Sequence, residues 1–267
     1  MVEIKIDPEI FPKRLSSYLF GVCFLLVICD VIFTYFDVTC YYLFRRSFDM
    51  TREESIPNWY ASILLFAIAL INAWVFSVLR ATSRPKADYL PWAFFSLFFL
   101  FLSMDDGARI HERTGDFFRA LTEDGVGLFI VFQGVLQTAS TWAWQVFVLP
   151  VFLFIGFFML FWGGQNVTNP RARRAVLAGA GVITIAIGLD YLEGLIEFNV
   201  IDINNLAISS KSFTHFQRVT EEFLEIAGFV FVLCGLLVHL LDLMNSVVIS
   251  AGTKEGRGRL LLVPQEG

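Results

Sequence analysis

The chain has few of the residues on which disulfide frameworks and histidine-rich metal centres depend. Three of its four cysteines, Cys23, Cys29 and Cys234, lie inside apolar runs, and only Cys40 is expected in a loop. This placement excludes a disulfide framework. The chain also has only three histidines, with His239 at the far end of an apolar run. A copper or haem site built from several histidines is therefore not expected.

Charge is scarce as well, because only 17% of the residues are charged. The basic residues cluster in short loops and form no stripe, which excludes a nucleic-acid partner. No small-residue cleavage site follows the first apolar run, so we expect an uncleaved span there and no signal peptide. What the chain has in excess is apolar surface, with 56% hydrophobic residues, 30 Phe and a mean hydropathy of +0.65. These values indicate an integral membrane protein in contact with the lipid bilayer.

Six apolar runs have the length of about 20 residues that a membrane-spanning helix needs. They lie at about 15–36, 59–79, 89–109, 142–163, 174–196 and 221–243. A further run at 125–140 is short and carries Gln133 and Gln137, so we assign the segment at about 120–140 to an interfacial or re-entrant position. The sequence predicts an all-α, polytopic membrane helical bundle of six transmembrane helices, in a single transmembrane domain over 1–267.

Basic residues predict the orientation of the bundle, because cytoplasmic loops are enriched in Lys and Arg. The clusters are Lys13 with Arg14; Arg80, Arg84 and Lys86; Arg171, Arg173 and Arg174; and Lys254, Arg257 and Arg259. All of them share one side only if there are six spans and both the N and C termini are cytoplasmic. Arg45, Arg46 and Arg52, in the first outer loop, run against this rule. We expect a multi-pass protein of the cell inner (plasma) membrane.

The stretch 92–119 begins as an apolar run and turns at Asp105 into a string of ionisable residues. Continued as one helix, it places Asp105, Arg109, Glu112 and Asp116 on a single face, because residues three and four apart are neighbours. Charged groups at this depth are costly in hydrocarbon, so they are expected to face protein or a water-filled cavity.

Matching acids occur in three other spans. With a rise of about 1.5 Å per residue, Asp30, Asp105, Asp190 and Glu225 each lie about 24–26 Å from the cytoplasmic boundary of their helix. Polar residues continue outward from each of them at helical spacing, and Gln145 lies on a similar stripe that leads into the fourth span. The sequence thus predicts an acidic cavity, built from spans one, three, five and six, that opens to the outer side.

A mixture of carboxylates and imidazoles is a donor set that suits Zn, Mn or Fe, so a divalent metal ion is the predicted cofactor. The pattern contains no HExxH, and Glu-x-x-His does not occur twice as in di-iron bundles. The predicted ligands are Asp105, His111, Glu112, Glu222, Glu225, Asp190 and Glu193. The predicted supporting residues are Asp30, Asp106, Arg109, His215, Arg218 and Glu221.

Several functions remain open for such a cavity. One is a metal-dependent enzyme that acts on a membrane-associated, lipid-like substrate, with Ser103 as an assisting residue. A second is a proton- or cation-coupled transport element, although no charged residue continues the path through the inner half. A third is a non-catalytic subunit or assembly factor that docks other membrane subunits. A purely structural network is also open, in which arginines pair with the carboxylates.

Three stretches carry a family resemblance. SMDDGARIHE, followed by DYLEG and EEFLEIAGF, resembles an uncharacterised bacterial multi-pass membrane protein family. That family has an S-x-D-[DE]…H-E signature on one helix and E-E-x-x-E on a later one. The resemblance covers about spans three to six and implies no activity.

Overall fold

Long helices make up most of the part of the chain that the structure describes. This computed structural model describes residues 10–39, 41–82, 84–124, 143–197, 210–245, 247–251 and 260–264. The helices are α1 (Ile10–Asp30), continued by a π-helical turn η1 (Val31–Tyr35), α2 (Tyr42–Phe48), α3 (Ile56–Ala81), α4 (Lys86–Ala108), α5 (Ile110–Glu123), α7 (Ala143–Phe147), α8 (Leu149–Asn166), α9 (Pro170–Glu197) and α10 (Ser210–Asn245). Two antiparallel strands, β1 (Val247–Ala251) and β2 (Leu260–Pro264), follow α10.

Six of the described helices are long and apolar enough to cross a membrane. They run over Ile10–Tyr35, Ile56–Ala81, Lys86–Ala108, Leu149–Asn166, Pro170–Ile196 and Ser212–Met244. The predicted all-α bundle with six spans is therefore confirmed, with boundaries that differ by several residues. The fourth span begins at Leu149 and not at 142, because a separate short helix, α7, precedes it. Most of the predicted interfacial segment, residues 125–140, lies outside the described residues.

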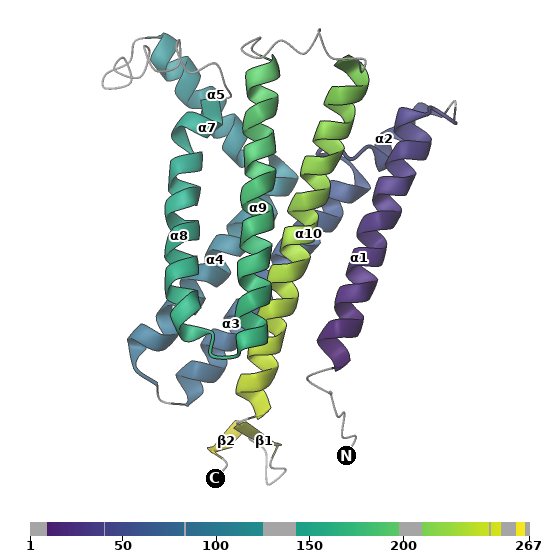
Figure 1. Ribbon diagram of the computed structural model, residues 1–267. Helices are drawn as coiled ribbons and strands as arrows, with labels where there is room; N and C mark the ends of the chain where they lie inside the picture. Colours follow the sequence, from purple (N-terminus) through teal and green to yellow (C-terminus); the bar gives the residue numbers. More distant parts are fainter. Residues whose placement is uncertain are drawn as a thin grey trace.

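The last helix organises the bundle, since α10 packs against α9, α3 and α1 (Figure 1). Its approach to α9 is close enough to require glycine. A Cβ atom at Gly179 would lie 2.7 Å from the backbone oxygen of Gly228. The buried core then fills the space between α10, α3 and α4, where Ile226, Val230 and Phe95 belong to one apolar cluster.

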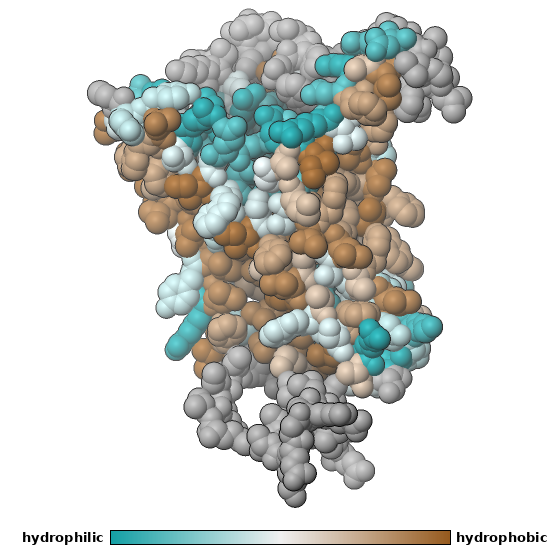
Figure 2. Space-filling view, turned by 180° about the vertical axis from the view of Figure 1, so that it is seen from behind, coloured by the Kyte–Doolittle hydropathy of each residue, from teal (hydrophilic) through white to brown (hydrophobic). Residues whose placement is uncertain are grey.

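The two ends of the bundle differ in chemistry. The end at which α1 begins and α10 ends, here called the basic end, carries the exposed Arg80, Lys86 and Arg173. The opposite end, which carries α2, α5 and α7, is called the acidic end (Figure 1). Figure 2 shows hydrophilic side chains gathered near this end above a broad hydrophobic belt. In the predicted orientation, the acidic end faces the outer, non-cytoplasmic side of the membrane.

The chain does not run through Asp105 and Glu112 as one helix, so that prediction is wrong. Helix α4 ends at Ala108, and Arg109 adopts a left-handed backbone conformation with a φ of 55° before α5 begins at Ile110. The carboxylate of Asp105 accepts a hydrogen bond from the backbone N–H of His111 at 2.6 Å. This carboxylate satisfies one of the free amide groups in the first turn of α5. The break means that the acids before and after Arg109 do not form the single helical stripe that we predicted.

Candidate functional site: an acidic cluster at one end of the bundle

Asp105 and His111 form a close pair in the acidic cluster beside the helix break, and Asp105 is the more buried of the two. Only 4% of Asp105 is exposed, and its second carboxylate oxygen lies 2.9 Å from Nδ1 of His111. The imidazole also meets the ring of Trp144 edge-on, with centroids 4.8 Å apart. Burial alone lowers the pKa of His111, but the contact with Asp105 and the nearby carboxylates outweighs it, so the pKa is raised above its ordinary value. The arrangement fixes the ring and favours its protonated form.

Arg109 joins two acids at the surface of this cluster. Its Nε lies 2.6 Å from Glu53, and its guanidinium also pairs with Glu112, three residues further along the chain. Burial and the neighbouring Glu112 carboxylate raise the pKa of Glu53 to about 7, although Arg109 and His111 act in the opposite direction. Glu112, a predicted metal ligand, is thus held by an arginine.

Asp106 turns to the other side of α4 and meets α3. Ser62 donates a hydrogen bond to its carboxylate at 2.5 Å, and Asn58 donates to its backbone oxygen at 3.0 Å. Ser103 donates to the backbone oxygen of Ser62 at 2.9 Å. This hydrogen bond gives Ser103 a role in holding α4 against α3.

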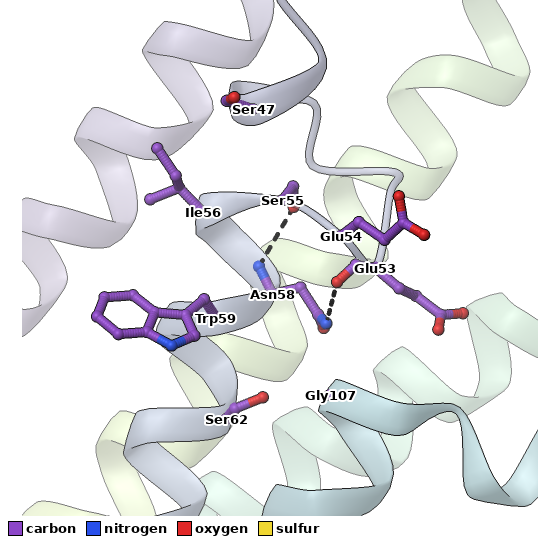
Figure 3. Close-up of a pocket in the computed structure, with 9 residues that line it drawn as sticks. All are labelled: Ser47, Glu53, Glu54, Ser55, Ile56, Asn58, Trp59, Ser62 and Gly107. Atoms are coloured by element: carbon purple, nitrogen blue, oxygen red, sulfur yellow. Dashed lines mark hydrogen bonds between the residues drawn. The ribbon is translucent and has the colours of Figure 1, made fainter. Parts of the chain in front are cut away.

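An open groove of about 360 Å³ lies next to Asp106. Figure 3 shows it between the start of α3 and the end of α4, with Glu53 and Glu54 along the chain that enters α3, Ser62 beside Gly107, and Trp59 at the left. Asn58 links the two walls, since its amide donates to the backbone oxygen of Glu53 as well as to that of Asp106. The acidic cluster is therefore reached from the surface beside α3.

Asp30 lies apart from this group. It is fully buried and accepts a hydrogen bond from the backbone N–H of Met50 at 3.0 Å. Its other oxygen lies 3.0 Å from Nε2 of His215 on α10. His215 precedes Glu225 by about 15 Å of helix. Asp30 therefore contacts α10 at His215, well away from the level of Glu225. The prediction of four acids at one depth is wrong for Asp30.

On α9, the two predicted acids have partners of different kinds. Asp190 accepts a hydrogen bond from Gln145 of α7 at 2.6 Å, so the glutamine of the polar stripe that leads into the fourth span does reach an acid of the cluster. Glu193 pairs with Arg218 of α10 at 2.6 Å. Close by, Gln217 donates to the backbone oxygen of Leu189 at 2.9 Å and approaches Glu221 at 3.4 Å. These contacts tie α7, α9 and α10 together at the acidic end.

Glu222 and Glu225 on α10 differ from the other acids. Both are partly buried, and Glu225 lies within electrostatic reach of three acids, Asp105, Asp106 and Asp190, and of one basic residue, His111. In the described ranges of the chain, no arginine, lysine or hydrogen-bond donor pairs with either glutamate. The structure therefore brings these two predicted ligands towards the acids of α4 and α9 without an arginine or lysine partner, and His111 is the basic residue that acts on Glu225.

The two histidines belong to separate pairs, His111 with Asp105 and His215 with Asp30. Among the residues that the structure describes, no group of three or more His, Cys, Asp or Glu side chains is arranged to hold one metal ion. The predicted ligands thus occupy one end of the bundle without converging on a single point.

Some residues of the cluster were not predicted from the sequence. Asn58 and Ser62 hold Asp106, Glu53 pairs with Arg109, and Trp144 packs on His111. Asn58 and Ser62 lie four residues apart near the start of an apolar run, so their common helical face was a readable signal. The positions of Glu53 and Trp144 depend on how the loops return to the bundle, which spacing does not reveal.

Comparison with known proteins gives a family and no activity. No curated protein and no solved structure is similar enough to this chain to match it. Residues 18–240 match a family described as a domain of unknown function, DUF8692, and this range contains the Asp105–His111 pair and the glutamates of α10. The match agrees with the resemblance to an uncharacterised membrane family, and the chain belongs to the DUF8692 family.

Proposed function

We propose that the acidic end of this integral membrane protein binds a cation, and that Glu222 and Glu225 are its principal ligands. One observation carries the proposal: these two glutamates lie within electrostatic reach of acids on α4 and α9, and no described arginine or lysine pairs with them. Neighbouring carboxylates in a poorly solvated place must share protons or hold a cation. Glu222 and Glu225 are three residues apart on α10, so they share a face and can act on one ion.

The ion pairs at this end argue against a purely structural network. Two arginines beside the glutamates of α10 are used elsewhere, because Arg109 pairs with Glu53 and Glu112, and Arg218 pairs with Glu193. Arg45, Arg46 and Arg52 pair with Asp37, Glu54 and Asp49 around α2. A structural role explains these paired acids. It leaves Glu222 and Glu225 unexplained.

A divalent metal ion remains the cation that the sequence predicts. The described side chains do not gather the three or four ligands that Zn²⁺ requires. A hard cation fits better, because Mg²⁺ or Mn²⁺ can bind through one or two carboxylates and keep water as its other ligands. Glu222 and Glu225 would hold such an ion, with Asp106 and Asp190 on the helices opposite α10.

The test measures cation binding to the purified full-length chain in lipid nanodiscs. Isothermal titration calorimetry is performed with Mn²⁺, Mg²⁺, Zn²⁺ and Na⁺ in turn. We expect Glu222→Gln and Glu225→Gln each to weaken binding of the preferred cation about tenfold or more, or about 1.4 kcal/mol. Glu123→Gln is the matched control, because Glu123 is exposed at the end of α5 on the same side of the bundle. Equal binding by all variants, or no saturable binding of any of these ions, would contradict the proposal.

A second candidate function is suggested by the Asp105–His111 pair. A carboxylate that holds Nδ1 orients the imidazole and leaves Nε2 to accept a proton, which is the arrangement of a general base. In the described part of the chain, Nε2 of His111 has no hydrogen-bond partner. At a pH above the raised pKa of His111, its Nε2 would take a proton from a water molecule that attacks a membrane-associated, lipid-like substrate.

This second function is tested by incubating the protein in liposomes with ester- and phosphoester-linked lipids and detecting products by mass spectrometry. We expect His111→Gln to abolish any turnover. His215→Gln, which alters the other Asp–His pair, should leave most of it. Turnover that is equal in wild type and His111→Gln would rule out this role for His111.

A further inference from the structure

A second polar site lies in the basic half of the bundle, inside the apolar core. His239 of α10 is only 2% exposed, and its ring stacks on the indole of Trp92 of α4, with centroids 5.3 Å apart and an interplanar angle of 25°. Neither ring nitrogen has a hydrogen-bond partner among the described residues. A buried imidazole without partners is costly, so this position needs an explanation.

Asn72 of α3 presents a second unpartnered group. It is 1% exposed, and its amide nitrogen donates to the backbone oxygen of Ile68 at 2.8 Å. Its carbonyl oxygen has no partner in the described part of the chain. Asn72 thus belongs to the buried face of α3, with one acceptor left over.

The register of α3 and α4 places these two groups at one level. Ser96 of α4 donates to the backbone oxygen of Ala69 at 2.9 Å, so these positions lie side by side on antiparallel helices. Moving towards the basic end by about one turn leads from Ala69 to Asn72 and from Ser96 to Trp92. Because His239 stacks on Trp92 and α10 packs against α3, the unpartnered groups face the same part of the core.

This site is separate from the acidic cluster. Between Glu225 and His239, α10 runs for about 21 Å. Its inward face over that length is apolar and buried, with Ile226, Val230 and Leu233. The nearer surface is the basic end, since α10 ends about 9 Å beyond His239.

We propose that His239 and Asn72 form a buried hydration site that takes water from the basic end of the bundle. The chemistry of the free groups selects this ligand. A neutral imidazole offers one donor and one acceptor, and the carbonyl of Asn72 offers one acceptor. A water molecule has two donors and can accept two hydrogen bonds, so one water can bridge a ring nitrogen of His239 and the carbonyl of Asn72, as buried waters commonly do. The other ring nitrogen points away from the first, so it needs a second water. The hydrated imidazole can then exchange its proton with water, which a dry one cannot. This proposal does not depend on cation binding at the acidic end.

The experiment is water-edited solid-state NMR of the full-length protein in liposomes, with ¹⁵N-labelled histidine. The chain has only three histidines, so three imidazoles are observed, and His239→Gln identifies the signal of His239. We expect magnetisation to pass from water to the ring of His239, and we expect this transfer to be lost in Asn72→Leu. The signals of His111 and His215 serve as internal controls for folding.

No transfer from water to His239 in the wild-type protein would overturn the proposal, whatever the variants do. Transfer that persists unchanged in Asn72→Leu would remove Asn72 from the site. Because the wild-type spectrum is decisive by itself, the test does not depend on how well the variant folds.

Discussion

Asp105 binds His111 twice, once at the backbone N–H and once at the ring, at 2.6 and 2.9 Å from its two carboxylate oxygens. One buried side chain thereby satisfies the first turn of α5 and fixes the imidazole beside Trp144. The left-handed Arg109 lies between them and breaks the helix, so that the first turn of α5 can meet the side chain of Asp105. The position of His111 in the acidic cluster therefore depends on Asp105.

Asp105→Asn should separate these two effects. The amide oxygen can still accept the backbone hydrogen bond of His111, but the negative charge that favours the imidazolium is lost. Since burial then dominates, we expect the pKa of His111 to fall. We also expect a loss of about 1–3 kcal/mol in the free energy of unfolding. A ¹⁵N-histidine NMR titration measures the pKa, and Asp116→Asn, an exposed acid on α5, is the control. An unchanged pKa in Asp105→Asn would show that the contact does not control His111.

Glu53 should make the protein less stable as the pH rises from 4.5 to about 7. Its pKa in the folded protein is about 7, raised from an ordinary value of 4.5 chiefly by burial and by Glu112. The folded state therefore binds more protons than the unfolded state between these two values, and stability falls with rising pH in that interval. We expect Glu53→Gln to reduce this slope between pH 4.5 and 7, as followed by thermal unfolding in nanodiscs.

The control for Glu53 is Glu54→Gln, because Glu54 is exposed and pairs with Arg46 at the surface. It removes the same charge from the neighbouring position. A pH slope that is identical in wild type and Glu53→Gln would mean that Glu53 does not titrate in this interval.

Apolar runs sufficed to predict the spans, because a bilayer imposes a length that sequence shows directly. The acidic cluster was predicted from the same helices, and Gln145 does contact Asp190. The break at Arg109 was not predicted, since its cause is a side-chain contact between Asp105 and the start of α5, which helical spacing cannot reveal. The prediction that Asp30 lies level with Glu225 was wrong because helical spacing does not show how two helices pack against each other. Equal distance along each helix does not give equal depth, and Asp30 meets α10 at His215.

Gly115 and Gly107 provide a matched pair for testing how α5 is held. A Cβ atom at Gly115 would lie 2.5 Å from the backbone nitrogen of Trp144, whereas one at Gly107 would meet nothing closer than 3.9 Å. We expect Gly115→Ala to push α5 away from α7 and to destabilise the protein by about 1–3 kcal/mol. Gly107→Ala should be neutral or slightly stabilising, because alanine favours a helix. Thermal unfolding measures both, and equal effects would show that the close approach at Trp144 is not limiting.

The predicted orientation can be tested with single cysteines at opposite ends of the bundle. Asp116 on α5 and Arg173 on α9 are both exposed, and they lie at opposite ends of a span. The orientation predicted from the basic residues would put the acidic end on the outer side and the basic end in the cytoplasm. In a background whose four native cysteines are replaced by alanine, we expect Asp116→Cys to react with a membrane-impermeant maleimide added to intact cells. Arg173→Cys should react only after the membrane is opened. Labelling of Arg173→Cys alone in intact cells would invert the orientation, so the cation proposed at Glu222 and Glu225 would enter from the cytoplasm. Labelling of both from one side would contradict the six-span arrangement itself.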